Sequence, residues 1–266
     1  MSQHLRQIFQ AARRQKKALF LPYVCVGYPS YSASLKTAEA ALKAGASALE
    51  LGVPFSDPIA DGPTLQMATQ WALDHGTRVE DAFKLMAALR RKGYGQPLLV
   101  MTYLNPIEQM GWDLFSRRLA DAGGDGAIVP DLPLEKFDEY GFFLRNRGLS
   151  LIPFLAPTSS PPRVQKVDAL GAPFLYYVSL TGVTGARKSL APGLLAALKA
   201  LRSRLRTPVV VGFGISNADQ AAQVGKVADG VIIASALIQL ISRTKAAAIG
   251  KAVGSFCGRV VHSLGR

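Results

Sequence analysis

Residues 208–234 read PVVVGFGISNADQAAQVGKVADGVIIA. This stretch predicts an apolar strand over Pro208–Gly212, a helix over Ser216–Val224 and a second apolar strand over Gly230–Ala234. Both expected strands are almost continuously apolar, which is typical of strands that are buried on both faces of a parallel sheet. Because parallel neighbours are joined by a long crossover, usually a helix, we interpret the stretch as one β–α–β unit.

The same alternation of strand and helix runs along the whole chain. We expect eight strands, over Leu19–Val26, Ala48–Val53, Pro97–Met101, Gly126–Pro130, Ser150–Leu155, Phe174–Val178, Pro208–Gly212 and Gly230–Ala234. Helical patterns lie between them, over Ser32–Ala44, Val79–Lys92, Trp112–Ala122, Leu134–Arg147, Gly193–Leu205 and Ser216–Val224. Ser32 and Ser216 are the expected N-caps of two of these helices. Eight strand–helix units in about 250 residues are the size of a (β/α)8 or TIM barrel.

A further helix is expected before the barrel. Leu5, Ile8, Phe9 and Ala12 recur at helical spacing and predict an amphipathic helix over about residues 2–16. The rest of the sequence contains no proline-rich or serine-rich linker. We therefore predict an α/β protein with one domain, residues 1–266, in which an extra N-terminal helix precedes a single TIM barrel over about residues 19–266.

The composition excludes disordered and membrane-spanning proteins. A hydrophobic content of 49% and a charged content of 18% are typical of a folded chain. The most apolar stretch, residues 231–241, is interrupted by Ser235 and Gln239 and is shorter than the roughly 20 residues of a membrane span. Basic residues before the apolar run 18–26 loosely resemble a secretory signal, but Pro22 interrupts that run and no cleavage site follows it. We expect no membrane partner.

Cysteine and histidine usage gives no support for a metal site. Cys25 and Cys257 have no CxxC spacing and predict neither a zinc site nor a disulfide framework. His4, His75 and His262 lie far apart in the sequence, in no HExxH or similar pattern. We therefore expect no bound metal, a reducing cytoplasmic location, and chemistry that uses carboxylates.

The chain is strongly basic, with 31 Lys and Arg against 18 Asp and Glu and a net charge of +13. This charge suits an anionic partner, and arginine pairs at 13/14, 90/91 and 117/118 leave nucleic-acid binding open as an alternative. The pairs are spread over several expected helices without interleaved stacking aromatics. Solvated helix faces explain them better, so we expect no nucleic-acid partner.

Two carboxylates follow one another around the end of the second expected strand, in the sequence LELGVPFSDPIADGP at 49–63. Glu50 is flanked by leucines, so burial in the barrel would raise its pKa. Asp61 is expected on a wetter loop, where it stays ionised, and environments that differ in this way give two carboxylates different acid–base roles. The alternative is structural: an internal cation neutralises Glu50, while Asp57 and Asp61 cap a helix that begins near Thr64.

Turns that suit phosphate binding follow the last three expected strands. Gly212, Phe213 and Gly214 come after the seventh strand, and Ala234 and Ser235 follow the eighth. These are the two loops that often bind phosphate in TIM barrels. After the sixth strand, the sequence TGVTGAR at 181–187 predicts a mobile lid with an additional phosphate donor, with an ordinary flexible loop as the alternative.

Five motifs, in order along the chain, resemble the α subunit of tryptophan synthase: LELGVPFSDPIADGPTLQ, MTYLNP, IVPDLP, YYVSLTGVTGAR and VGFGIS. The resemblance runs from about Leu19 to Ser235. It implies a TIM-barrel lyase that cleaves indole-3-glycerol phosphate to indole and glyceraldehyde 3-phosphate without a metal or organic cofactor. Pyridoxal phosphate is expected only in a β subunit, to which indole passes through a tunnel within an αββα assembly.

The resemblance also assigns site residues. The catalytic pair falls on Glu50 and Asp61, Tyr176 matches the tyrosine beside the indole, and Thr184 matches the threonine that closes onto the catalytic aspartate. Further indole contacts fall on Tyr23, Met101 and Ile128; phosphate contacts on Gly185, Gly212, Phe213, Gly214, Ala234 and Ser235; and β-subunit contacts on Pro54, Asp57 and Asn105. Ala234 departs from the glycine common in the family, which puts the affinity for phosphate in doubt.

Two other functions remain open besides nucleic-acid binding. In the first alternative, the chain is a binding module that activates a β subunit and has lost its lyase chemistry. In the second, it is a phosphate-binding barrel, such as an isomerase, that acts on another sugar phosphate. The acid–base set of Glu50, Asp61, Tyr176 and Thr184 argues against the first. An apolar wall of indole size near Tyr23, Ile128 and Tyr176 argues against the second, because a small polar substrate does not need it.

Overall fold

The structure is a computed structural model that describes residues 1–178, 190, 192–212 and 214–265. Its strands form one nine-stranded sheet in the order β5-β4-β3-β2-β1-β9-β8-β7-β6, with parallel pairing between neighbours. The strands are β1 (Leu19–Cys25), β2 (Leu49–Gly52), β3 (Leu98–Met101), β4 (Gly126–Ile128), β5 (Ser150–Ile152), β6 (Phe154–Leu155), β7 (Leu175–Val178), β8 (Val209–Gly212) and β9 (Gly230–Ile233). Each of the eight predicted strands is present.

The ninth strand arises because the predicted strand over Ser150–Leu155 is divided at Pro153. Proline has no N–H group to donate to a neighbouring strand, which interrupts the ladder at this residue. The carbonyl of Pro153 still accepts a hydrogen bond from the Tyr176 N–H at 2.9 Å. Since β5 pairs with β4 and β6 pairs with β7, this single residue closes the sheet into the predicted TIM barrel.

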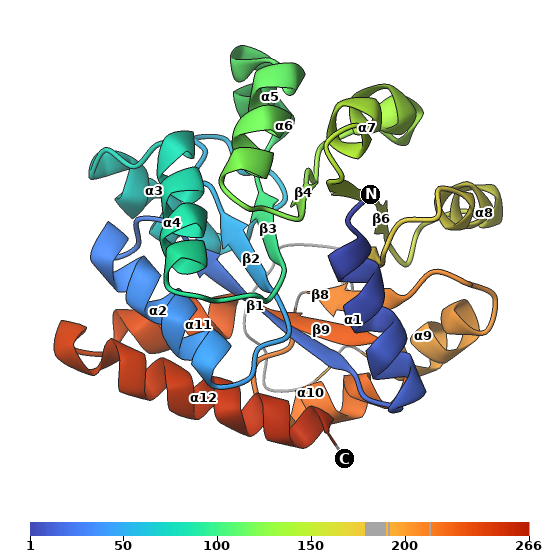
Figure 1. The fold of residues 1–266 in the computed structure, drawn as a ribbon. Helices are drawn as coiled ribbons and strands as arrows, with labels where there is room; N and C mark the ends of the chain where they lie inside the picture. The colour runs from blue at the N-terminus through green and yellow to red at the C-terminus, as the bar shows by residue number, and fades with distance from the viewer. Residues whose placement is uncertain (179–189, 191, 213, 266) are drawn as a thin grey trace.

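Helices surround the sheet (Figure 1). They are α1 (Gln3–Arg14), α2 (Tyr31–Lys43), α3 (Pro63–Asp74), α4 (Val79–Arg91), α5 (Leu104–Met110), α6 (Trp112–Asp121), α7 (Phe137–Arg145), α8 (Pro161–Ala169), α9 (Leu194–Arg202), α10 (Ala218–Gly225), α11 (Ser235–Ser242) and α12 (Ile249–Leu264), with short 3-10 turns at Leu134–Lys136 and Ala246–Ala248. The two expected N-caps are wrong: Ser30 caps α2 and Asn217 caps α10, each by accepting a backbone N–H three residues ahead.

The predicted N-terminal helix, α1, closes the amino-terminal end of the barrel. Its apolar side buries Leu5, Phe9 and Ala12. The Ser2 hydroxyl donates to Asp125 at 2.9 Å, and Arg13 donates to both carboxylate oxygens of Asp229 at 2.8 and 3.1 Å. These two carboxylates directly precede β4 and β9. Among the described residues, no helix is both long and apolar enough to cross a membrane.

Candidate active site

Glu50 lies in the middle of the barrel end that α1 leaves open. It belongs to β2, pairs in register with Tyr23 of β1, and is only 1% exposed. Burial raises the pKa of Glu50 to about 8, and the neighbouring charge of Asp61 acts in the same direction. Its Oε2 atom has no hydrogen-bond partner in the described part of the chain. Glu50 is therefore mostly protonated at neutral pH, as the sequence predicted from its leucine neighbours.

Asp61 approaches Glu50 from the loop after β2. The expectation of a wet loop is wrong, because the loop folds back over the barrel and leaves Asp61 only 5% exposed. Burial raises the pKa of Asp61 to about 6, while a hydrogen bond from the Tyr103 hydroxyl acts in the opposite direction. That hydroxyl also accepts the Ala60 N–H at 3.1 Å, which fixes the loop beside Asp61. Asp61 is thus mostly ionised at neutral pH.

The structural alternative for these carboxylates is not supported. The N-cap of α3 is Gly62, followed by Pro63, and no side chain caps this helix. Asp57 instead accepts a hydrogen bond from its neighbour Ser56. Within the described ranges, no basic side chain forms an ion pair with Glu50. A proton-bearing carboxyl and a carboxylate therefore share one desolvated site, and no described basic side chain neutralises them.

Two glycines make room for the two tyrosines of the site. A Cβ atom on Gly212 would lie 2.2 Å from the hydroxyl oxygen of Tyr176, and a Cβ atom on Gly52 would lie 1.9 Å from that of Tyr23. Both distances are far below van der Waals contact. Gly212, which the sequence assigned to the phosphate site, is thus required here by the ring of Tyr176.

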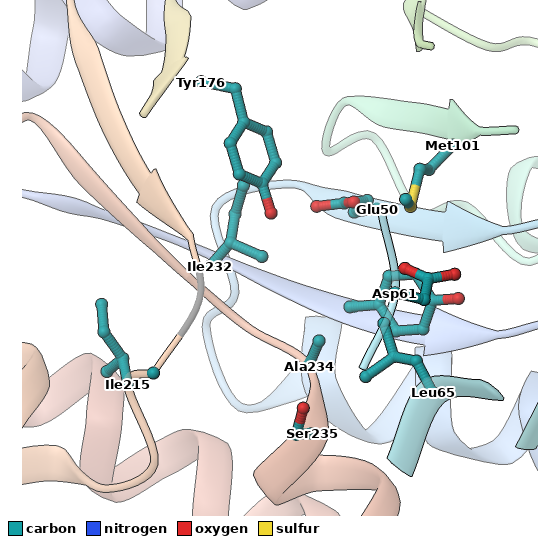
Figure 2. Close-up of a pocket in the computed structure, with 11 residues that line it drawn as sticks. Glu50, Asp61, Leu65, Met101, Tyr176, Ile215, Ile232, Ala234 and Ser235 are labelled. Atoms are coloured by element: carbon teal, nitrogen blue, oxygen red, sulfur yellow. The ribbon is translucent and has the colours of Figure 1, made fainter. Parts of the chain in front are cut away.

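The carboxylates line a narrow inner cavity of about 20 Å³ (Figure 2). The Tyr176 hydroxyl points towards Glu50 across this cavity, and Met101 lies beside Glu50 on the other side. Its lining residues come from six strands or the turns and helices that follow them: Tyr23, Glu50, Asp61, Leu65, Met101, Tyr176, Gly214, Ile215, Ile232, Ala234 and Ser235. The inner cavity therefore brings the predicted catalytic pair together with most of the predicted substrate contacts.

A wider outer cavity of about 450 Å³ shares Glu50, Met101 and Tyr176 with the inner one. Ile128, a predicted indole contact, lies in its wall. Phe154 belongs to the same wall and stacks on Tyr176, with ring centroids 4.9 Å apart. A cavity of this size with mostly apolar walls and a few polar groups is typical of a small-molecule site.

The remaining predicted site residues are not all brought together. Thr184, Gly185 and Phe213 lie outside the described residues. Asp57 and Asn105, assigned to a partner surface, are exposed. Pro54, assigned to the same surface, is buried, because the chain is still close to the end of β2 at this residue.

Several residues of the site were not predicted. Tyr103 lies two residues beyond the end of β3, in the motif MTYLNP, and its place at a strand end was the available signal. Ile215 and Ile232 complete the inner cavity, and Phe154 and Arg163 line the outer one. The apolar members carry no sequence signal that separates them from ordinary core residues.

The described residues contain no group of three or more His, Cys, Asp or Glu side chains that can hold a metal ion. The site is better suited to bind an anionic group. Ser235 begins α11 at the inner cavity, and the first backbone N–H groups of a helix have no partner within it. The arrangement can therefore protonate a carbon or oxygen atom from Glu50, stabilise positive charge with Asp61 and hold an anion near Ser235.

Comparison with known proteins agrees with this geometry. The model of the tryptophan synthase alpha chain family matches residues 9–256. The chain is 45% identical to the tryptophan synthase alpha chain of Roseiflexus sp. (strain RS-1) over 239 residues, which are 90% of this chain and 92% of that protein.

Solved structures give the same result over the full length of the fold. A tryptophan synthase alpha chain from Legionella pneumophila superimposes with a TM-score of 0.90 and 33% identity, covering 99% of this chain and 97% of the other. A tryptophan synthase from Mycobacterium tuberculosis matches with a TM-score of 0.88 and 34% identity, covering 99% of both chains. The chain therefore belongs to the tryptophan synthase alpha chain family.

Proposed function

We propose that the chain, as a single-domain barrel, cleaves indole-3-glycerol phosphate to indole and glyceraldehyde 3-phosphate. The observation that carries the proposal is the pair of buried carboxyl groups whose pKa values are about 8 for Glu50 and about 6 for Asp61. Two neighbouring carboxyl groups with separated pKa values are suited to opposite acid–base roles near pH 7. Family membership supplies the substrate.

The reaction breaks the bond between indole C3 and the first side-chain carbon. Protonated Glu50 delivers its proton to C3, which places positive charge on the ring nitrogen. Ionised Asp61 accepts a hydrogen bond from that N–H group and stabilises the charge. The bonding electrons then return to the ring, while the side-chain hydroxyl gives its proton to the Glu50 carboxylate and becomes the aldehyde. The proton balance of Glu50 is restored at the end of the cycle.

The substrate contacts are assigned from the family resemblance, and the two cavities support part of the assignment. The indole ring is assigned to the walls formed by Tyr23, Met101, Ile128 and Tyr176, which are buried and largely apolar. The phosphate is assigned to the other side of the inner cavity, with Gly185, Gly212, Phe213, Gly214, Ala234 and Ser235 as its contacts. Thr184 is assigned the role of orienting Asp61. The reaction needs no metal or organic cofactor in this chain.

We further propose a partner, a pyridoxal-phosphate-dependent β subunit in a cytoplasmic αββα assembly. Pro54, Asp57 and Asn105 are the assigned contacts, and the exposed pair Asp57 and Asn105 supports a surface at the carboxyl end of the barrel. Ile59 belongs to the same loop as Asp57 and is 80% exposed. Because Ile59 also lines the outer cavity, a partner bound to this loop would lie beside that cavity. Indole is expected to pass from the outer cavity to this partner.

The test is indole release from indole-3-glycerol phosphate by the purified chain, alone and with a tryptophan synthase β subunit. Glu50→Gln and Asp61→Asn are each expected to lower turnover by about 10²- to 10⁴-fold, since each removes an acid–base or charge-stabilising group. Glu135→Gln and Asp121→Asn make the same chemical changes at exposed positions and are expected to keep full activity.

Near-normal turnover in a folded Glu50→Gln or Asp61→Asn protein would overturn the role of that residue. Activation of the β subunit by a wild-type chain that releases no indole would instead identify a binding module. Circular dichroism of each variant separates either result from loss of the fold.

A further inference from the structure

The outer cavity has one basic residue among its described lining residues, Arg163. Most of the wall is apolar and includes Ile128, Phe154 and Val178. Arg163 lies with Thr158 and Ser159 in the segment that leads into and begins α8, whereas the other polar groups of the wall, Glu50 and Tyr176, come from strands.

Arg163 has no partner within the described part of the chain. It forms no ion pair within 4.0 Å, and it donates no hydrogen bond there. The sequence of residues 179–189, SLTGVTGARKS, contains no Asp or Glu that could pair with it. Among the described residues, nothing accepts a hydrogen bond from the guanidinium group, which lies beside a mostly apolar cavity.

Helix stability does not explain this arginine. It occupies the first turn of α8, which begins at Pro161, and a cation there is disfavoured by the positive end of the helix dipole. The Ser159 hydroxyl accepts the Ala156 N–H at 2.9 Å, which fixes the turn that leads into the helix. A fixed turn and an unfavourably placed cation are compatible with an anionic ligand as the missing partner.

We propose that Arg163 and the outer cavity form a subsite for an aromatic carboxylic acid. The apolar wall at Ile128 and Phe154 suits a flat ring, and a guanidinium group binds a planar carboxylate through two parallel hydrogen bonds. A carboxylate carries one negative charge, which one arginine matches. A phosphate group carries about −1.5 to −2 charges at neutral pH, which one arginine does not neutralise.

This subsite is distinct from the proposed phosphate site. Gly214 and Ser235 line only the inner cavity, whereas Arg163 lines only the outer one. Met101 and Tyr176 line both, so a ring held against them excludes the indole ring of the substrate. Aromatic acids therefore compete with the substrate. This competition rests on the proposed function, whereas the binding of the acid does not.

The experiment compares indole-3-acetate with indole-3-acetamide, which has the same shape without the charge. Isothermal titration calorimetry on the full chain measures the affinity of both compounds, and indole release measures competition with the substrate. The acid is expected to bind about tenfold more tightly than the amide, because a charged bidentate pair at a half-exposed site is worth roughly one decade in affinity. In Arg163→Gln this preference is expected to disappear while affinity for the amide stays unchanged.

Arg14→Gln is the matched control, since it removes the same charge from an exposed position at the end of α1. It is expected to keep the tenfold preference. Equal affinities of wild type for acid and amide would overturn the proposal, and so would a preference that survives in Arg163→Gln, because the carboxylate then binds elsewhere. Failure of both compounds to bind a chain that still releases indole would overturn the subsite and leave the proposed cleavage intact.

Discussion

Replacing Glu50 by glutamine is expected to stabilise the fold, by an amount that increases with pH. In the folded chain the pKa of Glu50 is raised from 4.5 to about 8 by burial. The unfolded chain therefore releases this proton at lower pH than the folded chain does. Between pH 4.5 and 8 the unfolded chain binds fewer protons than the folded chain. A rise in pH in this range therefore favours the unfolded chain and lowers the free energy of unfolding.

The magnitude follows from the same two pKa values. Each pKa unit corresponds to about 1.4 kcal/mol. Ionisation of Glu50 then lowers the free energy of unfolding of the wild-type chain by up to about 5 kcal/mol above pH 8 and by about 3 kcal/mol at pH 7. Below pH 4.5 it has almost no effect. Glutamine resembles the protonated acid in shape and polarity, so its own burial adds an offset that does not vary with pH.

Urea unfolding followed by circular dichroism at pH 5, 6, 7 and 8 measures this difference. The gain in the free energy of unfolding of Glu50→Gln over wild type is expected to increase at each step. Glu135→Gln, at an exposed position, is the control and is expected to show no such trend. A difference that stays constant between pH 5 and 8 would refute the reasoning, because Glu50 would then ionise alike in the folded and unfolded chains.

Two further predictions concern the same site, and a third concerns a glycine in α12. Turnover is expected to fall both below about pH 6 and above about pH 8, since Asp61 must be ionised and Glu50 protonated; a pH–rate profile without the alkaline decline would contradict the role of Glu50. Gly212→Ala is expected to abolish turnover by displacing the ring of Tyr176. Gly250→Ala lies in α12, where a Cβ atom meets nothing within 4 Å, and it is expected to raise the free energy of unfolding by about 0.5–1 kcal/mol. Steady-state assays and urea unfolding check both, and full activity of Gly212→Ala would show that the ring has room to move.

The barrel was predictable because its strands are buried on both faces. Each strand is a short, nearly continuous apolar run, and glycine or proline marks its ends. The details that failed depend on backbone geometry rather than composition. Ser30 and Ser32 are equally good caps by residue type, and only the extended backbone of Ser30 decides between them.

That Glu50 and Asp61 lie in one cavity was predictable for a different reason. Glu50 interrupts an apolar strand, which is unusual enough to signal function. The burial of Asp61 was not predictable, because it depends on the Tyr103 hydroxyl, which comes from another strand and fixes the loop through the Ala60 N–H. Arg163 was missed because an arginine in the first turn of a helix does not indicate a binding site until the cavity beside it is known.

The contacts of α1 also constrain how the chain is made. Arg13 is synthesised well before its partner Asp229, which lies 216 residues later. At about 5–20 residues per second, the ribosome needs roughly 10–40 s to reach that partner. During this interval the helix face that carries Leu5 and Phe9 has no barrel end to cover. A nascent chain of this protein is therefore expected to expose that face to chaperones until β9 emerges and the barrel closes.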